Sequence, residues 1–262
     1  MGDVYTHGHH ETVLRSHTWR TAENSAGYLL AHLRPGMDLL DLGCGPGTIT
    51  VDLAGRVAPG RVLGVDASDD VIAKARAIAD GRAEFVVGDA YDLYVPDASF
   101  DVVHAHQVLQ HLTDPVAAVS EANRVLRPGG ILAVRDSDYA GFFWSPANER
   151  LSRWLELYHQ LTTRNRAEAD AGRHLPEWVR AGGFSDVTVT SSNWTFADAA
   201  GREWWGGMWA DRVQESSYAT QALEYGLSTA AELADIRAGW QEWIDQRDAV
   251  FVVPSVEVIA RK

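Results

Sequence analysis

Short apolar runs alternate with segments of helical period between residues 36 and 138. The runs are rich in Leu, Val, Ile and Phe, and in chain order they read MDLLDLG, RVLGVD, EFVVGD, FDVVHAH and GILAVRD. Near-continuous apolar runs separated by helices are typical of parallel strands that crossover helices connect. The pattern therefore predicts an α/β fold built on a mostly parallel sheet.

Two of the connecting segments carry recognisable helix ends. Ser68 can cap a helix over residues 68–79, and the two aspartates that follow it suit the positive end of the helix dipole. Asp114 can cap a second helix, in which Pro115 occupies the first turn. The RPGG sequence is expected to end this helix near Leu126, before the last apolar run begins.

The regions on either side of this core differ from it in composition. Residues 11–33 predict a helix or a pair of helices that folds over the ligand site. Nine of the ten tryptophans lie after Tyr139, where LPEWVRAGGFSDVTVTSS predicts a helix, a glycine turn and a strand. The final FVVPSVEVIARK predicts another strand, which Pro254 would place near an edge or a bulge. We expect three parts: an N-terminal helical lid over 1–35, a ligand-binding core over 36–138, and the rest of the sheet over 139–262 with a helical insertion at about 197–249.

A strand leads into three closely spaced glycines and then a helix in LLDLGCGPGTIT, residues 39–50. Gly43, Gly45 and Gly47 allow positive φ angles and close approach of a ligand to the backbone, and the helix N-terminus offers unpaired N–H groups. The nicotinamide dinucleotide fingerprint has its third glycine one position later, where this chain has Thr48. The spacing favours a different adenosine cofactor.

Two further polar positions follow the next strands. Asp66 ends the second strand, where a carboxylate can accept hydrogen bonds from ribose hydroxyls. Asp89 follows the third strand and can accept from the adenine amine, while the backbone of Ala90 is free to bond the ring edge. Because parallel strands end at one edge of the sheet, a single adenosine ligand can span all three elements.

Together these motifs resemble the class I methyltransferases, particularly the branch similar to the ubiquinone and menaquinone biosynthesis enzymes. The resemblance covers about residues 36–138 and rests on LDLGCGPGT, VLGVDAS, GDA, FDVVHAHQVLQHLTDP and RVLRPGGILAV, which occur in the family's order. It implies a doubly wound, mostly parallel seven-stranded sheet of order 3-2-1-4-5-7-6 with an antiparallel seventh strand, for which FVVPSVEVIARK is the candidate. It also implies S-adenosyl-L-methionine as the cofactor and methyl transfer to a small molecule.

The resemblance also implies roles for individual residues. The three glycines would line the methionine part of the cofactor, Asp66 would hold the ribose, and Asp89 with Ala90 would hold the adenine. Asp41 would lie near the methionine amine. Independently of the resemblance, Arg20 in the N-terminal segment could pair with the methionine carboxylate. The full set of predicted cofactor-binding residues is Asp41, Gly43, Gly45, Gly47, Asp66, Ala67, Asp89, Ala90, His106 and Arg20.

The catalytic candidates are histidines on and just after the fourth apolar run. By the two-residue period of a strand, His104 and His106 share one face, and the reference pKa of histidine lies near neutrality, which suits a general base. We expect His104 to be a core residue with a satisfied hydrogen bond, and His106 to act in catalysis or to shape the cofactor pocket. His111 is the preferred base for a proton on the acceptor.

The tryptophan-rich C-terminal region holds the candidates for acceptor binding. The sequence WWGGMW at residues 204–209 predicts a hydrophobic or aromatic pocket, and an ordinary aromatic core is the alternative. Asp136, Asp138 and Tyr139 follow the fifth apolar run, where each could reach the mouth of the pocket or cap a loop.

The net charge and the cysteine and histidine content limit the classes of partner and of metal site that the protein is expected to have. A net charge of −13 repels a phosphate backbone, so nucleic acid is not an expected partner. Cys44 is the only cysteine, and we expect a small buried residue with no chemistry. His7, His9 and His10 lack ordered Cys or carboxylate partners, so no metal is expected. The polar N-terminus and the short apolar runs predict no signal peptide and no membrane span, and hence a cytoplasmic protein. The expected partner is a small-molecule acceptor, and a homodimer is left open.

Two other functions fit part of the pattern. A nicotinamide-dependent oxidoreductase shares the strand, the glycine loop and the ribose acid, but Thr48 and the GDA element count against it. A non-catalytic binding protein could keep the methyltransferase fold as a scaffold or sensor. Turnover with any acceptor would separate that protein from an enzyme.

Overall fold

The computed structural model describes residues 19–262. The predictions that concern His7, His9, His10 and the first part of the lid, up to residue 18, lie outside these described residues.

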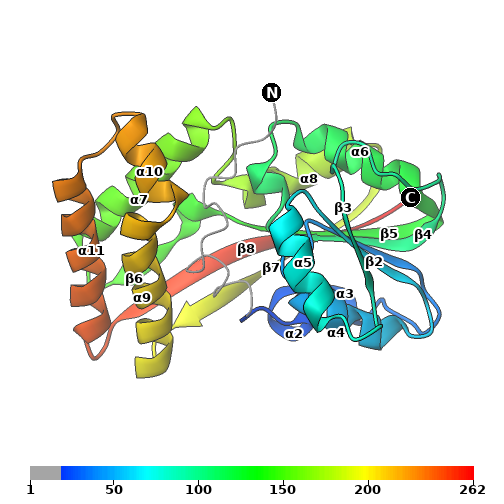
Figure 1. The fold of residues 1–262 in the computed structure, drawn as a ribbon, viewed down its shortest axis with the longest axis horizontal. Coiled ribbons are helices and arrows are strands. Elements are labelled where there is room, and N and C mark those ends of the chain that lie inside the picture. Colours follow the sequence, from blue (N-terminus) through cyan, green and yellow to red (C-terminus); the bar gives the residue numbers. More distant parts are fainter. Residues whose placement is uncertain (1–18) are drawn as a thin grey trace.

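An eight-stranded sheet forms the centre of the molecule (Figure 1). Its parallel strands lie in the order β3-β2-β1-β4-β5, and the antiparallel β8 follows β5. Strand β7 pairs along its whole length with β8, and the three-residue β6 pairs with the beginning of β8. The bounds are β1 Leu39–Leu42, β2 Val62–Asp66, β3 Glu84–Val87, β4 Phe100–His106, β5 Leu126–Ser137, β6 Phe143–Ser145, β7 Asp186–Phe196 and β8 Val250–Arg261. The doubly wound, mostly parallel sheet with an antiparallel last strand is therefore confirmed, and the short β6 is an addition to it.

Pro254 was expected near an edge or a bulge, and the edge is wrong because β8 is an interior strand. The carbonyl oxygen of Pro254 accepts a hydrogen bond from the backbone N–H of Asp138 at 3.1 Å. In an antiparallel strand the N and O atoms of one residue point to the same side. The missing N–H of Pro254 therefore points into the gap where pairing with β5 ends, at Ser255, and pairing with β6 begins, at Val252. No ladder hydrogen bond is lost there, which is why the sheet accommodates the proline.

The predicted helix ends are confirmed for two connecting helices. Helix α5, Asp69–Ile78, is capped by the Ser68 side chain, which accepts from the backbone N–H of Val71. Helix α6, Pro115–Val125, is capped by Asp114, which accepts from the backbone N–H of Ala117 at 3.0 Å. It ends just before RPGG, which forms the start of β5, where the pairing with β4 is irregular.

Alternate residues of the strands face opposite layers of helices (Figure 1). Leu39 of β1 packs in a core with α2, α3 and α4, whereas the next residue, Leu40, packs with α6 and α8 on the other face. The bounds of these helices are α2 Ala22–Ser25, α3 Gly27–Leu30, α4 Thr48–Val57 and α8 Ala171–Ala181. Burial of both faces explains why the strands read as continuous apolar runs in the sequence.

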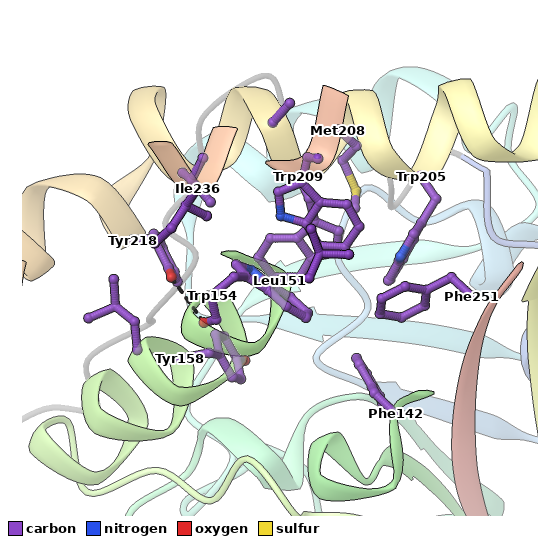
Figure 2. Packing of buried hydrophobic residues seen from close by; sticks show 14 of the residues in the cluster. Phe142, Leu151, Trp154, Tyr158, Trp205, Met208, Trp209, Tyr218, Ile236 and Phe251 are labelled. Atoms are coloured by element: carbon purple, nitrogen blue, oxygen red, sulfur yellow. Dashed lines mark hydrogen bonds between the residues drawn. The ribbon is translucent and has the colours of Figure 1, made fainter. Parts of the chain in front are cut away.

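Four further helices stand beside the sheet and enclose a second, aromatic core (Figures 1 and 2). Trp154 lies at its centre and meets the rings of Trp209 and Trp240 edge to face, with centroids 4.5 and 4.9 Å apart. For Trp154 and Trp240, the interpretation of aromatics as ordinary core is correct. The helices are α7 Glu149–Arg164, α9 Ala199–Glu215, α10 Ser217–Glu224 and α11 Ala230–Asp245, of which the last three fall within residues 197–249.

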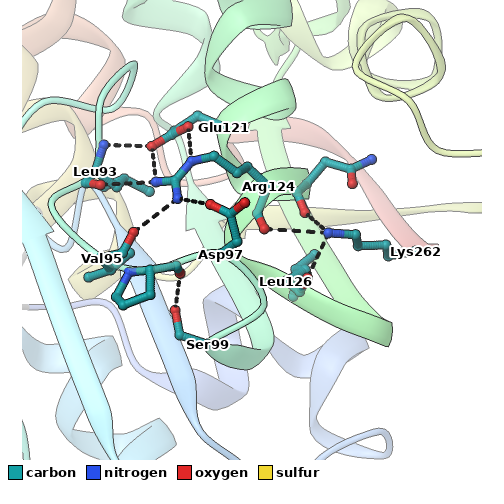
Figure 3. A network of polar contacts seen from close by, with 10 residues as sticks. Leu93, Val95, Asp97, Ser99, Glu121, Arg124, Leu126 and Lys262 are labelled. Atoms are coloured by element: carbon teal, nitrogen blue, oxygen red, sulfur yellow. Dashed lines mark hydrogen bonds and ion pairs between the residues drawn. The ribbon is translucent and has the colours of Figure 1, made fainter.

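A polar network attaches α6 to the loop between β3 and β4 (Figure 3). The Arg124 guanidinium donates to the backbone carbonyls of Leu93 and Val95, each at 3.0 Å, and to the carboxylates of Glu121 and Asp97. Glu121 in turn accepts from the backbone N–H of Leu93 at 2.7 Å. The network therefore holds in place the loop that begins at the predicted adenine site.

Candidate functional site

A cavity of about 500 Å³ opens at the carboxyl ends of the central strands and extends to the aromatic core. Its position is the one expected for a ligand in a doubly wound sheet. Nine of the ten predicted cofactor-binding residues line it: Arg20, Asp41, Gly43, Gly45, Asp66, Ala67, Asp89, Ala90 and His106. Gly47 is not in the wall of the cavity, so its role differs from that of the other two glycines.

The glycine loop has the left-handed backbone that its sequence predicts. The φ angles of Gly43, Gly45 and Gly47 are +64°, +55° and +84°. A Cβ atom on Gly43 would lie 2.4 Å from a methyl carbon of Val108, and one on Gly47 would lie 2.8 Å from the ring of Phe85. Both Gly43 and Gly47 therefore allow close packing of the loop, Gly43 against Val108 and Gly47 against Phe85 of β3. They differ in that Gly43, like Gly45, lines the cavity, whereas Gly47 does not.

Asp66 is held in the cavity wall by backbone groups on either side. Its carboxylate accepts from the backbone N–H of Gly45 at 3.0 Å and from that of Ser68 at 3.1 Å. A carboxylate has about four acceptor sites, so capacity remains for two hydroxyl groups of a ligand. The Asp66 carboxylate is thus anchored to the glycine loop and keeps acceptor sites free for a ligand.

Asp89 and Ala90 begin the loop after β3. Asp89 is exposed and accepts from the backbone N–H of Tyr91 at 2.9 Å, which orients its carboxylate. Ala90 is half-buried in the wall beside it. The two residues lie at the same edge of the sheet as Asp66, as the convergence of parallel strand ends requires.

Asp41 is buried and its two carboxylate oxygens are engaged inside the protein. One accepts from the Thr50 hydroxyl, and the other lies 2.7 Å from Nδ1 of His104. His104 is fully buried, as expected for a core histidine with a satisfied hydrogen bond. This buried pair fixes β1 against β4 and α4 directly beneath the glycine loop.

The chain places Arg20 beside residues that follow β4. Its guanidinium donates to the side-chain oxygen of Gln107, whose amide nitrogen donates to the Ser137 hydroxyl at 2.7 Å. Arg20 also lies 5.6 Å from the centre of the Trp194 ring, and the buried His106 ring lies 5.7 Å from the same ring. The N-terminal segment is thus attached to the end of the sheet that bears the glycine loop.

His111 lines the cavity at the end of a short 3₁₀ helix, Leu109–His111. Its Nε2 atom lies 3.0 Å from the side-chain nitrogen of Gln110, which orients the ring. Burial, assisted by the positive charge of Arg20, lowers the pKa of His111 to about 3. The imidazole is therefore neutral across the physiological pH range and can accept a proton, although it is a weak base.

Three residues were candidates for the pocket mouth: Asp136, which lies within β5, and Asp138 and Tyr139, which follow it. Of these, only Tyr139 lines the cavity. Asp138 instead binds Arg173 with both carboxylate oxygens, one of which accepts from Nη2 at 2.5 Å and the other from Nε at 2.7 Å, and it caps the turn that follows. Asp136 is fully buried, and burial raises its pKa to about 8, against the opposing effect of backbone N–H groups of Leu109 and Gln110.

Aromatic side chains form the end of the cavity away from the glycine loop. Trp205 and Trp209 project from α9 into the aromatic core (Figure 2), and both also line the cavity. Trp205 stacks on Phe196 with ring centroids 4.6 Å apart. The residues that line this end are Tyr139, Phe142, Trp194, Trp204, Trp205, Trp209, Arg212 and Val253. We call this set the aromatic end of the cavity.

The sequence reasoning missed several of these lining residues, among them Phe142, Trp194 and Arg212. A signal for Arg212 was present, because it follows Trp205 and Trp209 at spacings of seven and three residues, which place all three on one face of a helix. No comparable pattern marks Phe142 or Trp194, which come from a turn and an edge strand.

Other candidate groups have no visible chemistry in the described part of the chain. Burial and the nearby carboxylates of Asp41 and Asp66 raise the pKa of the Cys44 thiol, which keeps it protonated. Residues 19–262 contain no cluster of three or more His, Cys, Asp or Glu side chains that could hold a metal ion. Among the helices described, none is both long and apolar enough to cross a membrane.

Comparisons with known proteins agree with this geometry. A family model described as a methyltransferase domain matches residues 40–134. The chain is 30% identical to an uncharacterized methyltransferase, C1B3.06c, of Schizosaccharomyces pombe, over 98% of this chain and 96% of that protein. It is 29% identical to the probable methyltransferase ltbC of Aspergillus luteorubrus, over 98% and 97% of the two chains. The solved structure of the YcgJ protein from Bacillus subtilis shares the fold, with a TM-score of 0.62 at 18% identity, covering 92% of this chain and 98% of that one.

Proposed function

The chain belongs to the class I S-adenosylmethionine-dependent methyltransferases, and on that premise we propose that it methylates an oxygen, nitrogen or activated carbon of a small hydrophobic or aromatic acceptor. The cofactor is S-adenosyl-L-methionine and the acceptor is a small molecule. The observation that carries the proposal is the continuity of the cavity, which has carboxylates and bare backbone at one end and tryptophans at the other. Family membership decides against the nicotinamide-dependent oxidoreductase, whereas turnover with an acceptor is the test that separates an enzyme from a non-catalytic binding protein.

The residues at the strand ends fit the cofactor. Asp66 would accept from the ribose hydroxyls, and Asp89 with Ala90 would hold the adenine. Gly43 and Gly45 allow the methionine part to approach the backbone, because neither carries a side chain into the cavity. Arg20, which lines the same space, would pair with the methionine carboxylate.

The chain contributes to the reaction mainly by holding two molecules in line and excluding water. When bound, S-adenosyl-L-methionine supplies an electrophilic methyl group. Orientation alone can contribute about 7–11 kcal/mol to such a reaction, so a strong base is not obligatory. The proton of an attacking hydroxyl or amine becomes strongly acidic as its heavy atom gains the new bond, and neutral His111 would accept it despite its low pKa.

Methyl transfer from labelled S-adenosyl-L-methionine to a panel of acceptors tests the proposed function. We expect product with hydroxylated or aminated aromatic compounds and none with sugars or free amino acids, because tryptophan walls do not satisfy many hydroxyl groups. Transfer to strongly polar acceptors alone would contradict the proposal.

Replacing Asp66 with alanine should weaken cofactor binding by about tenfold to 100-fold. The loss corresponds to charge-assisted hydrogen bonds to the ribose, worth about 1.5–3 kcal/mol. Titration calorimetry with S-adenosyl-L-methionine measures the change, and Asp245→Ala, at an exposed aspartate at the end of α11 outside the cavity, is the control. Parent-like affinity in Asp66→Ala would show that the ribose is held elsewhere.

Replacing Trp205 with alanine should mainly raise the KM of the acceptor, by about tenfold. A wall of the pocket contributes similarly to ground-state and transition-state binding, so kcat should change little. Steady-state kinetics with an acceptor from the panel measures both constants. Trp243→Ala removes a buried tryptophan that does not line the cavity, and its acceptor KM should stay near that of the parent. A fall in kcat at constant KM for Trp205→Ala would contradict the pocket-wall role.

A further inference from the structure

Arg212 brings a positive charge into the aromatic end of the cavity. It lies on α9, one turn beyond Trp209, and its guanidinium carbon is 5.2 Å from the centre of that ring. Only 5% of the residue is exposed, yet it lines the cavity. A guanidinium has five N–H donors in a planar fork, so it can bind an anionic group with two parallel hydrogen bonds even when other donors are engaged.

The charges around the cavity are separated along its length. The acidic residues described in its wall are Asp41, Asp66 and Asp89, and all three lie at the carboxyl ends of β1, β2 and β3. The basic residues in the wall are Arg20, which lies 5.6 Å from the ring of Trp194, and Arg212 on α9. The charges of both act on the Tyr139 hydroxyl, where they partly offset the rise in pKa that burial causes. Since Arg20 is proposed to pair with the methionine carboxylate of the cofactor, Arg212 is the cation left for an acceptor that lies against the aromatic side chains.

Arg202, a second buried arginine on the same helix, has a structural role. Arg202 is 8% exposed, donates to the backbone carbonyls of Ala197 and Ile244, and does not line the cavity. It ties the start of α9 to the end of α11. Arg212 differs from Arg202 in that it lines the cavity, where its guanidinium is within reach of a bound acceptor.

We infer that Arg212 selects the acceptor, and that the acceptor is a planar aromatic molecule bearing a carboxylate, whose ring lies against Trp205 and Trp209 and whose carboxylate binds the guanidinium. The inference rests on the proposed function, since it specifies the acceptor of the same site. Aromatic walls alone would take neutral and anionic rings alike, whereas a charge-assisted bidentate pair discriminates between them.

The test compares acids with their neutral amides on three rings of increasing size. The probes are 4-hydroxybenzoate, 4-hydroxycinnamate and 6-hydroxy-2-naphthoate, each with its carboxamide, bound to the enzyme saturated with S-adenosylhomocysteine at pH 7.5. We expect at least one acid to bind about tenfold to 100-fold more tightly than its amide. Arg212→Met should reduce that ratio to within about twofold while leaving amide binding in place, and Arg202→Met, the matched control, should keep the parent's ratio.

Two outcomes overturn the inference. One is an acid-to-amide ratio near one in the parent on all three rings, including the absence of any binding. The other is a ratio that persists in Arg212→Met. Should Arg212→Met fail to fold, Arg212→Gln replaces it with the same expected loss of preference. Calorimetry with S-adenosylhomocysteine alone distinguishes failure of the proposed function from failure of this inference. If S-adenosylhomocysteine does not bind, the proposed cofactor site is rejected. If it binds but the acids are not preferred over the amides, only the role of Arg212 is rejected.

Discussion

Replacing His111 with alanine should lower kcat by about 10²–10³-fold, while the affinity for S-adenosyl-L-methionine stays within about twofold of the parent. The variant removes a neutral imidazole from the wall of the cavity but leaves the glycine loop and Asp66 intact. Loss of general-base catalysis typically costs about 10²–10⁴-fold, and a base of low pKa belongs in the lower part of that range. Rapid-quench and steady-state measurements of methyl transfer, with calorimetry for the cofactor, separate the two effects.

The dependence of kcat on pH tests the predicted protonation state of His111. Since the pKa of His111 is lowered to about 3, the imidazole stays neutral from pH 5 upward, and the parent should show no fall in kcat between pH 8 and pH 5 due to this group. His174→Ala, on α8 outside the cavity, is the control for loss of a histidine. A parent-like kcat in His111→Ala would mean that alignment of the two substrates alone accounts for catalysis. A fall in kcat below about pH 6.5 that is present in the parent and absent from the variant would mean that the pKa of His111 is not lowered.

Replacing Asp136 with asparagine should stabilise the protein at pH 8 by several kcal/mol and leave its stability at pH 4 nearly unchanged. Burial raises the pKa of this carboxyl from an ordinary value near 3.8 to about 8, so the folded state holds a proton that the unfolded state releases. The contribution of this carboxyl to the free energy of unfolding is therefore fully present below pH 3.8 and is lost progressively as the pH rises to 8. At about 1.4 kcal/mol per pKa unit, the upper limit of the loss is on the order of 5 kcal/mol.

Urea unfolding of both proteins at pH 4.5, 6.5 and 8.5 measures this effect. Asparagine keeps an oxygen to accept from the backbone N–H of Gln110, which in the parent lies 3.3 Å from the Asp136 carboxylate, and it cannot ionise. Asp138→Asn is the matched control, because that carboxylate is paired with Arg173, and its loss should destabilise the protein. An Asp136→Asn protein with the same pH slope as the parent would show that Asp136 ionises normally.

The sequence by itself determined the sheet and most of the cofactor end of the cavity. The signals there are local: apolar runs, capping residues such as Ser68 and Asp114, and glycines whose positive φ angles the turn after β1 requires. Parallel strands necessarily end at one edge, so Asp66 and Asp89 could be placed together without knowledge of packing. Even here Gly47 differed, because its contact with Phe85 depends on how α4 lies against β3.

Only the tertiary structure decided the aromatic end and the protonation of the buried groups. The tryptophans have the same local pattern whether they fill the core, as Trp154 does, or line the cavity, as Trp205 does, and the packing of α9 against α7 and α11 separates the two. Arg20 reaches Gln107 across 87 positions of sequence. Burial moves the pKa of Asp136 upward and that of His111 downward, and no sequence pattern reports the burial of a single polar side chain. Contacts between distant segments therefore set the chemistry of the aromatic end of the cavity, whereas local backbone preferences set the strand ends at which the cofactor is proposed to bind.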